Sequence, residues 1–284
     1  MSYRQRLNNC SLLYQAFSLF FLYVCYVFYP PLTITFLGTG TSSGVPMVAC
    51  GCEVCNSTDP HDTRLRSSIM VQSSTTTIVV DTTPDFRYQM LRENVKNIDA
   101  IIITHPHKDH IAGIDDTRPF QFFSGKPTLV YGSKMSLEGI KKEIPYAFQD
   151  FNYPGVPKLI LEEISLEPFR VGDIEIIPIL VWHLKMPVYG FRFGKFTYIT
   201  DANRIDQTEK EKIHGSETLV LNALRNEPHI SHFNLTEAVA LVNELGIPRG
   251  LFTHISHQLG LHASVNQNLP TNIFLAYDGL VLNI

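Results

Sequence analysis

The stretch Thr104-His105-Pro106-His107-Lys108-Asp109-His110 indicates both the fold of this chain and the place of its chemistry. It carries four metal-capable side chains within six positions and follows directly on the apolar run 100–103. Such a run predicts a buried strand, and the string after it predicts a loop at the strand's end. Imidazoles and carboxylates crowded in this way are typical of a site for Zn²⁺ or Mn²⁺.

Further metal-capable side chains follow other predicted strands. His183 comes after the apolar run 176–182, Asp201 ends the run 196–200, and His254 ends the run 251–253. With the first string they make five histidines and two aspartates, which is a ligand set for two catalytic divalent metals with an open position for water. The sequence therefore predicts a hydrolytic di-metal centre.

The length and net charge of the chain limit the classes of partner and substrate. The chain has 284 residues, 44% of them apolar, which is enough to bury a substantial core. Its 23 basic and 27 acidic side chains give a net charge of −4. Large nucleic acids need many cationic contacts to phosphate, so this balance disfavours such a partner. A small anionic phosphodiester substrate stays compatible, because bound metals supply positive charge locally.

Three of the five cysteines, Cys50, Cys52 and Cys55, lie close together. An odd cysteine count crowded in this way is a poor disulfide framework. It suits metal ligation in a reducing compartment, and we therefore expect a cytoplasmic protein.

Residues 1–32 form an apolar N-terminal segment, and residues 12–28 are almost wholly apolar. A run of about 17 residues is at the lower limit for a membrane span, and Arg4 and Arg6 before it would orient it with the arginines inside. We expect instead that the segment is a tail or an over-long start outside the functional domain. Membrane contact, with a membrane-anchored protein as the minor alternative, is expected only if residues 10–30 insert.

The remaining pattern predicts one domain over residues 33–284. Strands come in runs with helices before and after them, which favours two facing sheets with helices outside. The predicted helices are 84–92, 134–144 and 235–245, the last with Asn234 as its cap and Glu237 completing a capping box. The predicted strands are 33–37, 78–81, 100–104, 128–131, 174–181, 188–193, 196–200, 219–222 and 251–253.

The histidine string, followed by His183, Asp201 and His254, resembles the ligand set of the metallo-β-lactamase superfamily. That resemblance implies an α+β fold, a four-layer αβ/βα sandwich of two facing mixed sheets with outer helices. It also implies that Asp81, the acid closing an early strand, orients ligands from behind. The ligand sets it implies are His105, His107 and His183 for one metal, and Asp109, His110 and His254 for the other, with Asp201 bridging.

A finer resemblance rests on Thr39-Gly40, the cysteine cluster, residues 253–258 and Tyr277-Asp278-Gly279. These motifs are similar to the phosphoribosyl 1,2-cyclic phosphate phosphodiesterase subgroup of the phosphonate-degradation pathway. The resemblance implies a structural Zn²⁺ held by the three cysteines and His257. It also implies that His232 acts on the phosphate or its leaving group.

The function implied is opening of a small cyclic phosphate, such as phosphoribosyl 1,2-cyclic phosphate, by a metal-bridging hydroxide. A tRNA 3′-end nuclease shares the ligand set but wants a long basic arm, which this sequence does not show. A pyrroloquinoline quinone biosynthesis enzyme carries a similar cysteine cluster and would be favoured by iron and oxygen consumption. A non-catalytic metal-dependent binding or sensor protein is disfavoured by the complete ligand set. The sequence leaves a homodimer open.

Overall fold

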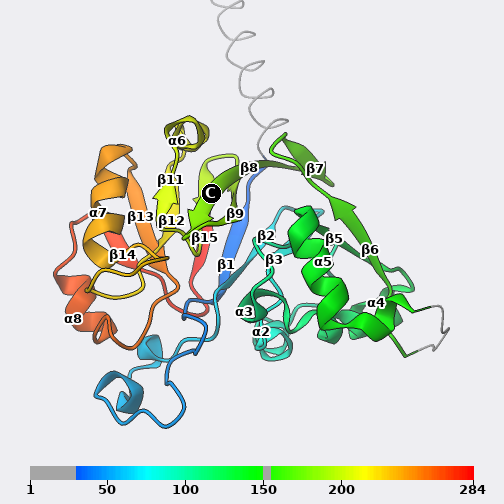
Figure 1. The fold of residues 1–284 in the computed structure, drawn as a ribbon, viewed down its shortest axis with the longest axis horizontal. Coiled ribbons are helices and arrows are strands. Elements are labelled where there is room, and N and C mark those ends of the chain that lie inside the picture. Colours follow the sequence, from blue (N-terminus) through cyan, green and yellow to red (C-terminus); the bar gives the residue numbers. More distant parts are fainter. Residues whose placement is uncertain (1–29, 150–154) are drawn as a thin grey trace, which may run out of the picture.

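Two mixed β-sheets face one another in the computed structural model, which describes residues 30–149 and 155–284 (Figure 1). The first sheet has the strand order β15-β1-β2-β3-β4-β5-β6. Its first four strands pair antiparallel, and β3 to β6 pair parallel. Its strands are β1 (Thr33–Gly38), β2 (Ser68–Gln72), β3 (Thr77–Val80), β4 (Ala100–Ile102), β5 (Thr128–Gly132), β6 (Leu159–Glu163) and β15 (Val281–Asn283).

The second sheet has the order β11-β8-β9-β10-β12-β13-β14, with β7 added on β8. It repeats the same plan, because β11 to β10 pair antiparallel and β10 to β14 pair parallel. Its strands are β7 (Phe169–Val171), β8 (Ile174–His183), β9 (Met186–Phe193), β10 (Phe196–Tyr198), β11 (Arg204–Ile205), β12 (Thr218–Asn222), β13 (Arg249–Thr253) and β14 (Ile273–Leu275).

The core lies in three slabs that match these layers. Between the sheets, Phe36 and Val80 of the first pack in one cluster with Phe191 and Leu251 of the second. Alternation along each strand sends the other side chains outward, where they meet helices. Leu219 and Phe252 thus pack against Leu241 and Val242 of α7.

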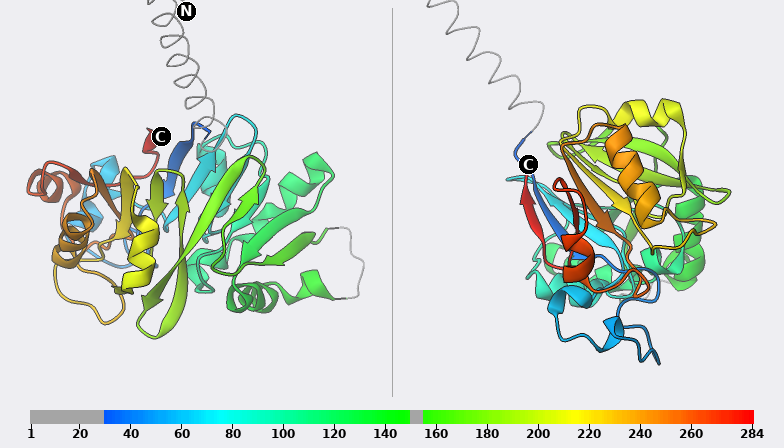
Figure 2. Two further views of the ribbon diagram at one scale, coloured as in Figure 1. Left: turned by 90° about the horizontal axis from the view of Figure 1, so that it is seen from above. Right: turned by 90° about the vertical axis from the view of Figure 1, so that its left-hand side faces the viewer.

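Helices cover the outer face of each sheet. Figure 2 shows α7 on the side of the second sheet that faces away from β1 and β15. The first-sheet helices are α2 (Phe86–Arg92), α3 (Lys108–Ile111), α4 (Arg118–Ser124) and α5 (Lys134–Glu143). The second-sheet helices are α6 (Gln207–Ile213), α7 (Leu235–Glu244) and α8 (His262–Gln267). Short 3₁₀ turns are η1 (Val54–Asn56), η2 (Pro60–Asp62), η3 (Ile114–Thr117) and η4 (Pro145–Phe148).

The four-layer sandwich expected from the sequence is confirmed, as is the capping box of α7, in which Asn234 and Glu237 bond each other's backbone N–H. Two strands are shorter than expected. The strand β4 ends at Ile102 and β10 at Tyr198, because the chain turns there to bring polar residues to the sheet edge. Short strands such as β11 and β14 were not predicted, because two or three residues are too few to show an alternation of apolar and polar side chains.

The N-terminal segment predicted as a tail or possible membrane segment lies, up to residue 29, outside the described residues. Within residues 30–149 and 155–284, no helix is long and apolar enough to cross a membrane.

Candidate metal centre

The metal-capable side chains meet where parallel strands of both sheets end. Asp81 directly follows β3, and the histidine string begins shortly after the neighbouring strand β4. From the second sheet, Asp201 follows β10 and His254 directly follows β13. Carboxyl ends of parallel strands share one edge, so both sheets deliver ligands to a single place.

The structure brings all seven expected ligands into overlapping groups, which we call the central cluster. Asp201 belongs to each group: with Asp109, His110 and His254; with His105 and His107; and with His183 and His232. In each group the candidate ligand atoms lie within 4.8 Å of one another. The cluster comprises His105, His107, Asp109, His110, His183, Asp201 and His254.

Asp201 occupies the middle of the central cluster. One of its oxygens lies 3.5 Å from His105 Nε2, and the other lies 3.5 Å from His110 Nε2 and 2.8 Å from His254 Nδ1. A carboxylate between two sets of imidazoles can bind one cation through each oxygen. Its position is compatible with a bridging ligand.

Asp81 stands behind the cluster and orients its histidines. It accepts hydrogen bonds from His110 Nδ1 at 2.7 Å and from Thr104 Oγ1 at 2.8 Å. Thr104 Oγ1 lies 2.9 Å from His105 Nδ1 and, having donated its proton to Asp81, accepts from that ring. Both rings are thereby held with Nδ1 protonated, so the Nε2 lone pairs face the centre.

Three site residues adopt a left-handed backbone that L-residues rarely use. Asp81 has φ of 67°, Asp201 of 52° and His254 of 54°. Each lies at or just past the end of its strand, where the turn redirects the side chain into the gap between the sheets. Such conformations cost of order 1–3 kcal/mol and cluster at functional sites.

The charges of the cluster call for a cation. Burial raises the pKa of Asp109 and of Asp201, but nearby imidazoles, His110 above all at Asp109 and His254 at Asp201, outweigh it and leave both below their usual values. Burial also opposes protonation of His110, yet Asp109 and Asp201 raise its pKa well above the usual value. His110 Nε2 is buried without a hydrogen-bond partner, 3.3 Å from Asp109. A divalent cation can take the place of the proton on His110 Nε2, because metals and protons compete for the same lone pairs.

The cluster opens to solvent on one side. His107 is exposed and His183 half-buried, whereas His105, His110 and His254 are buried. His183 is the last residue of β8, and its Nδ1 donates to Ser231 O at 2.8 Å, which turns Nε2 toward the cluster. Its ring lies nearer His107, at 5.1 Å between centroids, than His105, at 5.9 Å. The entrance is therefore on the His107–His183 side.

His232 lies beside two of the candidate metal ligands, His183 and His254. Its ring is 4.5 Å from that of His183 and stacks on that of His254 at 4.9 Å. Burial lowers its pKa to about 3, and its buried Nδ1 has no hydrogen-bond partner. It is thus a neutral imidazole with a free polar atom. The ring of His229 lies 5.1 Å from that of His232 and is tilted by 38° to it.

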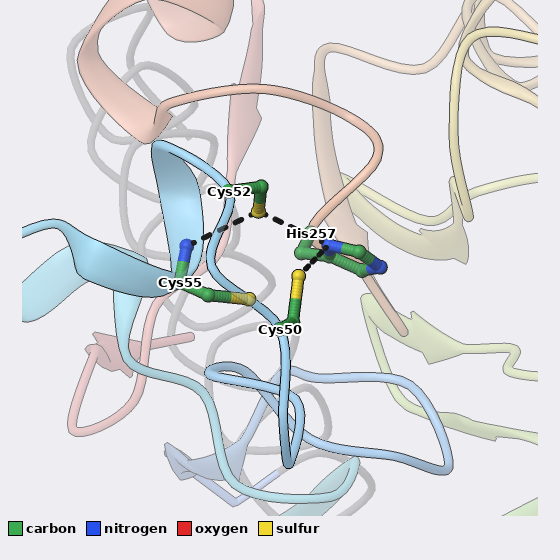
Figure 3. A group of neighbouring side chains, drawn as sticks. All are labelled: Cys50, Cys52, Cys55 and His257. Atoms are coloured by element: carbon green, nitrogen blue, oxygen red, sulfur yellow. Dashed lines mark hydrogen bonds between the residues drawn. The ribbon is translucent and has the colours of Figure 1, made fainter.

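A second group, which we call the thiol cluster, consists of Cys50, Cys52, Cys55 and His257 (Figure 3). His257 Nδ1 lies 3.4 Å from Cys50 Sγ and 3.2 Å from Cys52 Sγ. Backbone N–H groups of Met47 and Cys55 donate to sulfur. Three thiols and one imidazole within 4.8 Å of one another fit a closed tetrahedral Zn²⁺ site.

The pKa values of these thiols differ with their surroundings. The hydrogen bond from His257 lowers the pKa of Cys52 to about 6, whereas burial raises that of Cys55 to about 11. Binding a metal requires thiolates, so Cys52 is the thiol best prepared for it.

One residue of the site, Thr104, was not predicted from the sequence. Thr104 precedes the histidine string, yet nothing in the sequence marks it as the link between Asp81 and His105. Arg66 and Arg118 form ion pairs with Asp85 and Asp115.

Comparisons with known proteins agree with this geometry. A family model described as the beta-lactamase superfamily domain matches residues 76–255. The crystal structure of a diphosphatase from the PhnP family is 40% identical, with a TM-score of 0.84, and the match covers 89% of this chain and 98% of that one.

Two curated relatives are matched over part of their length. The octanoyltransferase of Porphyromonas gingivalis is 36% identical over 247 residues, which are 86% of this chain and 50% of that protein. Ribonuclease Z of Halalkalibacterium halodurans is 29% identical over 160 residues, 54% of this chain and 46% of that protein. The chain thus spans about half the length of each.

Proposed function

This chain belongs to the metallo-β-lactamase superfamily, and from that premise we propose that it is a phosphodiesterase for a small anionic substrate. It is a metal-dependent hydrolase with a PhnP-family relative. The observation that carries the proposal is the central position of Asp201 between two sets of imidazoles. A site of that form suits two divalent cations, Zn²⁺ or Mn²⁺.

We assign the ligands as the family resemblance implies. His105, His107 and His183 would hold one cation, and Asp109, His110 and His254 the other, with Asp201 shared. When bound, the cations supply Lewis acidity toward water and toward the phosphate. Cys50, Cys52, Cys55 and His257 would hold a separate structural Zn²⁺, which suits a reducing, cytoplasmic compartment.

The chain's own residues bind, orient and move protons. Asp81 and Thr104 fix the tautomers of His110 and His105 and so keep their lone pairs on the centre. His232, neutral and adjacent to His183, would donate a hydrogen bond to the departing oxygen as charge develops there. The burial of His254 and Asp201 excludes water from the far side of the site.

The substrate we favour is a cyclic phosphate such as phosphoribosyl 1,2-cyclic phosphate. A second candidate, favoured by the 40% identical diphosphatase, is the phosphoanhydride of a diphosphate ester. Ribonuclease Z-like cleavage of tRNA is less favoured, because the net charge of −4 offers little attraction for a polyanion. Octanoyl transfer wants a nucleophile for the acyl group, and the cysteines of the described part all lie in the thiol cluster.

The test is turnover by the purified full chain loaded with Mn²⁺ or Zn²⁺. Ribose 1,2-cyclic phosphate 5-phosphate, a 2′,3′-cyclic nucleotide, a diphosphate ester, a precursor tRNA and a β-lactam would be compared. We expect hydrolysis of the cyclic esters and its loss on chelation. Protein with full metal occupancy that hydrolyses no phosphate ester would refute the proposal.

A further inference from the structure

Two exposed aliphatic side chains flank the entrance of the central cluster. Leu184 directly follows the ligand His183 at the tip of the β8–β9 hairpin, and 52% of it is exposed. Ile230 lies two residues before His232, and 72% of it is exposed. Exposed aliphatic residues are ordinary when scattered singly, but here one follows the entrance residue His183 and the other lies near His232, whose ring is 4.5 Å from that of His183.

The backbone of Leu184 is unusual for its residue type. Its φ is 58°, a left-handed value that glycine or asparagine adopts easily and leucine does not. Burial of the side chain does not compensate for this backbone strain, because about half of Leu184 is exposed to water. The two-residue turn between β8 and β9 needs a positive φ at this position, which glycine or asparagine would supply more easily, so the presence of leucine points to a role for its side chain.

Asn203 joins the two loops and fixes their spacing. Its Oδ1 accepts from the N–H of Leu184 at 2.9 Å, and its Nδ2 donates to the carbonyl of Ile230 at 3.0 Å. Its own N–H donates to Trp182 O at 2.9 Å. Both ends of one side-chain amide are used, so the hairpin tip and the His232 loop are held as a preformed unit.

We propose that Leu184 and Ile230 form an apolar rim that binds a hydrocarbon or aromatic group carried by the substrate next to its phosphate. The inference rests on the proposed phosphodiesterase activity and narrows its substrate class. A rim held in place by Asn203 loses little conformational entropy when it binds such a group. The rim thus adds affinity for an apolar ester group beside the phosphate and leaves the site open to a compact cyclic ester.

The test uses two diesters of equal charge and identical leaving group, methyl p-nitrophenyl phosphate and phenyl p-nitrophenyl phosphate. The wild-type protein should show a higher kcat/KM for the phenyl ester. Leu184→Asn and Ile230→Asn should each reduce the phenyl-to-methyl ratio by roughly three- to tenfold, in line with apolar contacts in binding pockets. Because asparagine tolerates left-handed φ, Leu184→Asn should melt no lower than wild type.

Leu91→Asn is the matched control, since that leucine is 61% exposed on α2. It should leave the ratio unchanged. Equal efficiency of the wild type toward both esters, or the same ratio in wild type and both rim variants, would overturn the rim. Failure to hydrolyse either ester would instead overturn the phosphodiesterase proposal, and the rim with it.

Discussion

The central cluster and the thiol cluster differ in how their ligands are gathered. The central cluster draws side chains from both sheets, buries most of them and gives His105, His110 and His183 hydrogen bonds that fix their orientation. The thiol cluster takes three ligands from one short loop and is only partly buried. The first arrangement suits a reaction site, in which charge must be held in place. The second suits a structural site that joins a loop to the segment after β13.

The two clusters are nevertheless adjacent in the chain. His254 of the central cluster and His257 of the thiol cluster share one turn after β13. Damage to either cluster can therefore be compared in one protein, with catalysis as the readout for one and stability for the other.

The largest effect is expected for Asp201→Asn. Loss of the shared carboxylate should lower kcat/KM on the order of 10³-fold, as for groups that act as one catalytic unit. Activity on bis-p-nitrophenyl phosphate and metal content would be measured together. The control is Asp173→Asn, which removes a carboxylate bonded to Ser73 and Thr76 away from both clusters. Activity within twofold of wild type would contradict the bridging role.

Asp81→Asn should cost less, about 10- to 100-fold in metal affinity or activity. The carboxylate accepts from His110 Nδ1 and Thr104 Oγ1 on one oxygen and from the Thr104 N–H on the other. Asparagine keeps only one accepting oxygen, and its NH2 group would face a donor in the place of the second. Titration of metal-free protein with Mn²⁺ would show the weaker binding. An unchanged metal affinity would mean that the His110 tautomer needs no such support.

Cys50→Ser should act on stability more than on chemistry. We expect the loss of one bound Zn²⁺ per chain and a fall in Tm of roughly 5 °C, since structural zinc contributes directly to folding. Val48→Ser is the control, because that side chain is 90% exposed in the same loop. A large fall in activity with an unchanged Tm would contradict the proposed difference between the clusters.

The smallest effect is expected at His262, which contacts Arg64. Burial, with Arg64 close by, lowers its pKa to about 4 from the usual 6.5. The folded state thus favours the neutral ring, so its stabilising contribution is present above pH 6.5 and lost as pH falls toward 4. His262→Asn keeps an acceptor for Arg64 and removes the titration. The variant should show a weaker drop of Tm between pH 6.5 and 4, and an equal drop would contradict the assignment.

Sequence reasoning went far for the fold because its signals are local. The apolar runs before the histidine string, Asp201 and His254 predicted strands, and the strand ends predicted one shared edge. The capping box of α7 could likewise be read from Asn234 and Glu237 alone.

What the sequence could not give depends on contacts across long separations. The amide of Asn203 bridges residues 184 and 230, and no pattern in either loop announces it. The neutral state of His232 follows from burial among His183 and His254, which only the assembled sheets create. The left-handed backbone of Asp201 likewise shows only in the fold, where its oxygens face His105 on one side and His110 and His254 on the other.

The origin of the ligands in both sheets has a mechanical consequence. An ion bound between the histidine string and Asp201 would have ligands from both sheets. Part of its binding free energy would therefore stabilise the packing of one sheet against the other. Removal of this ion should first increase the hydrogen-exchange rates of backbone amides near the ends of β4 and β10. The rest of each sheet should stay protected.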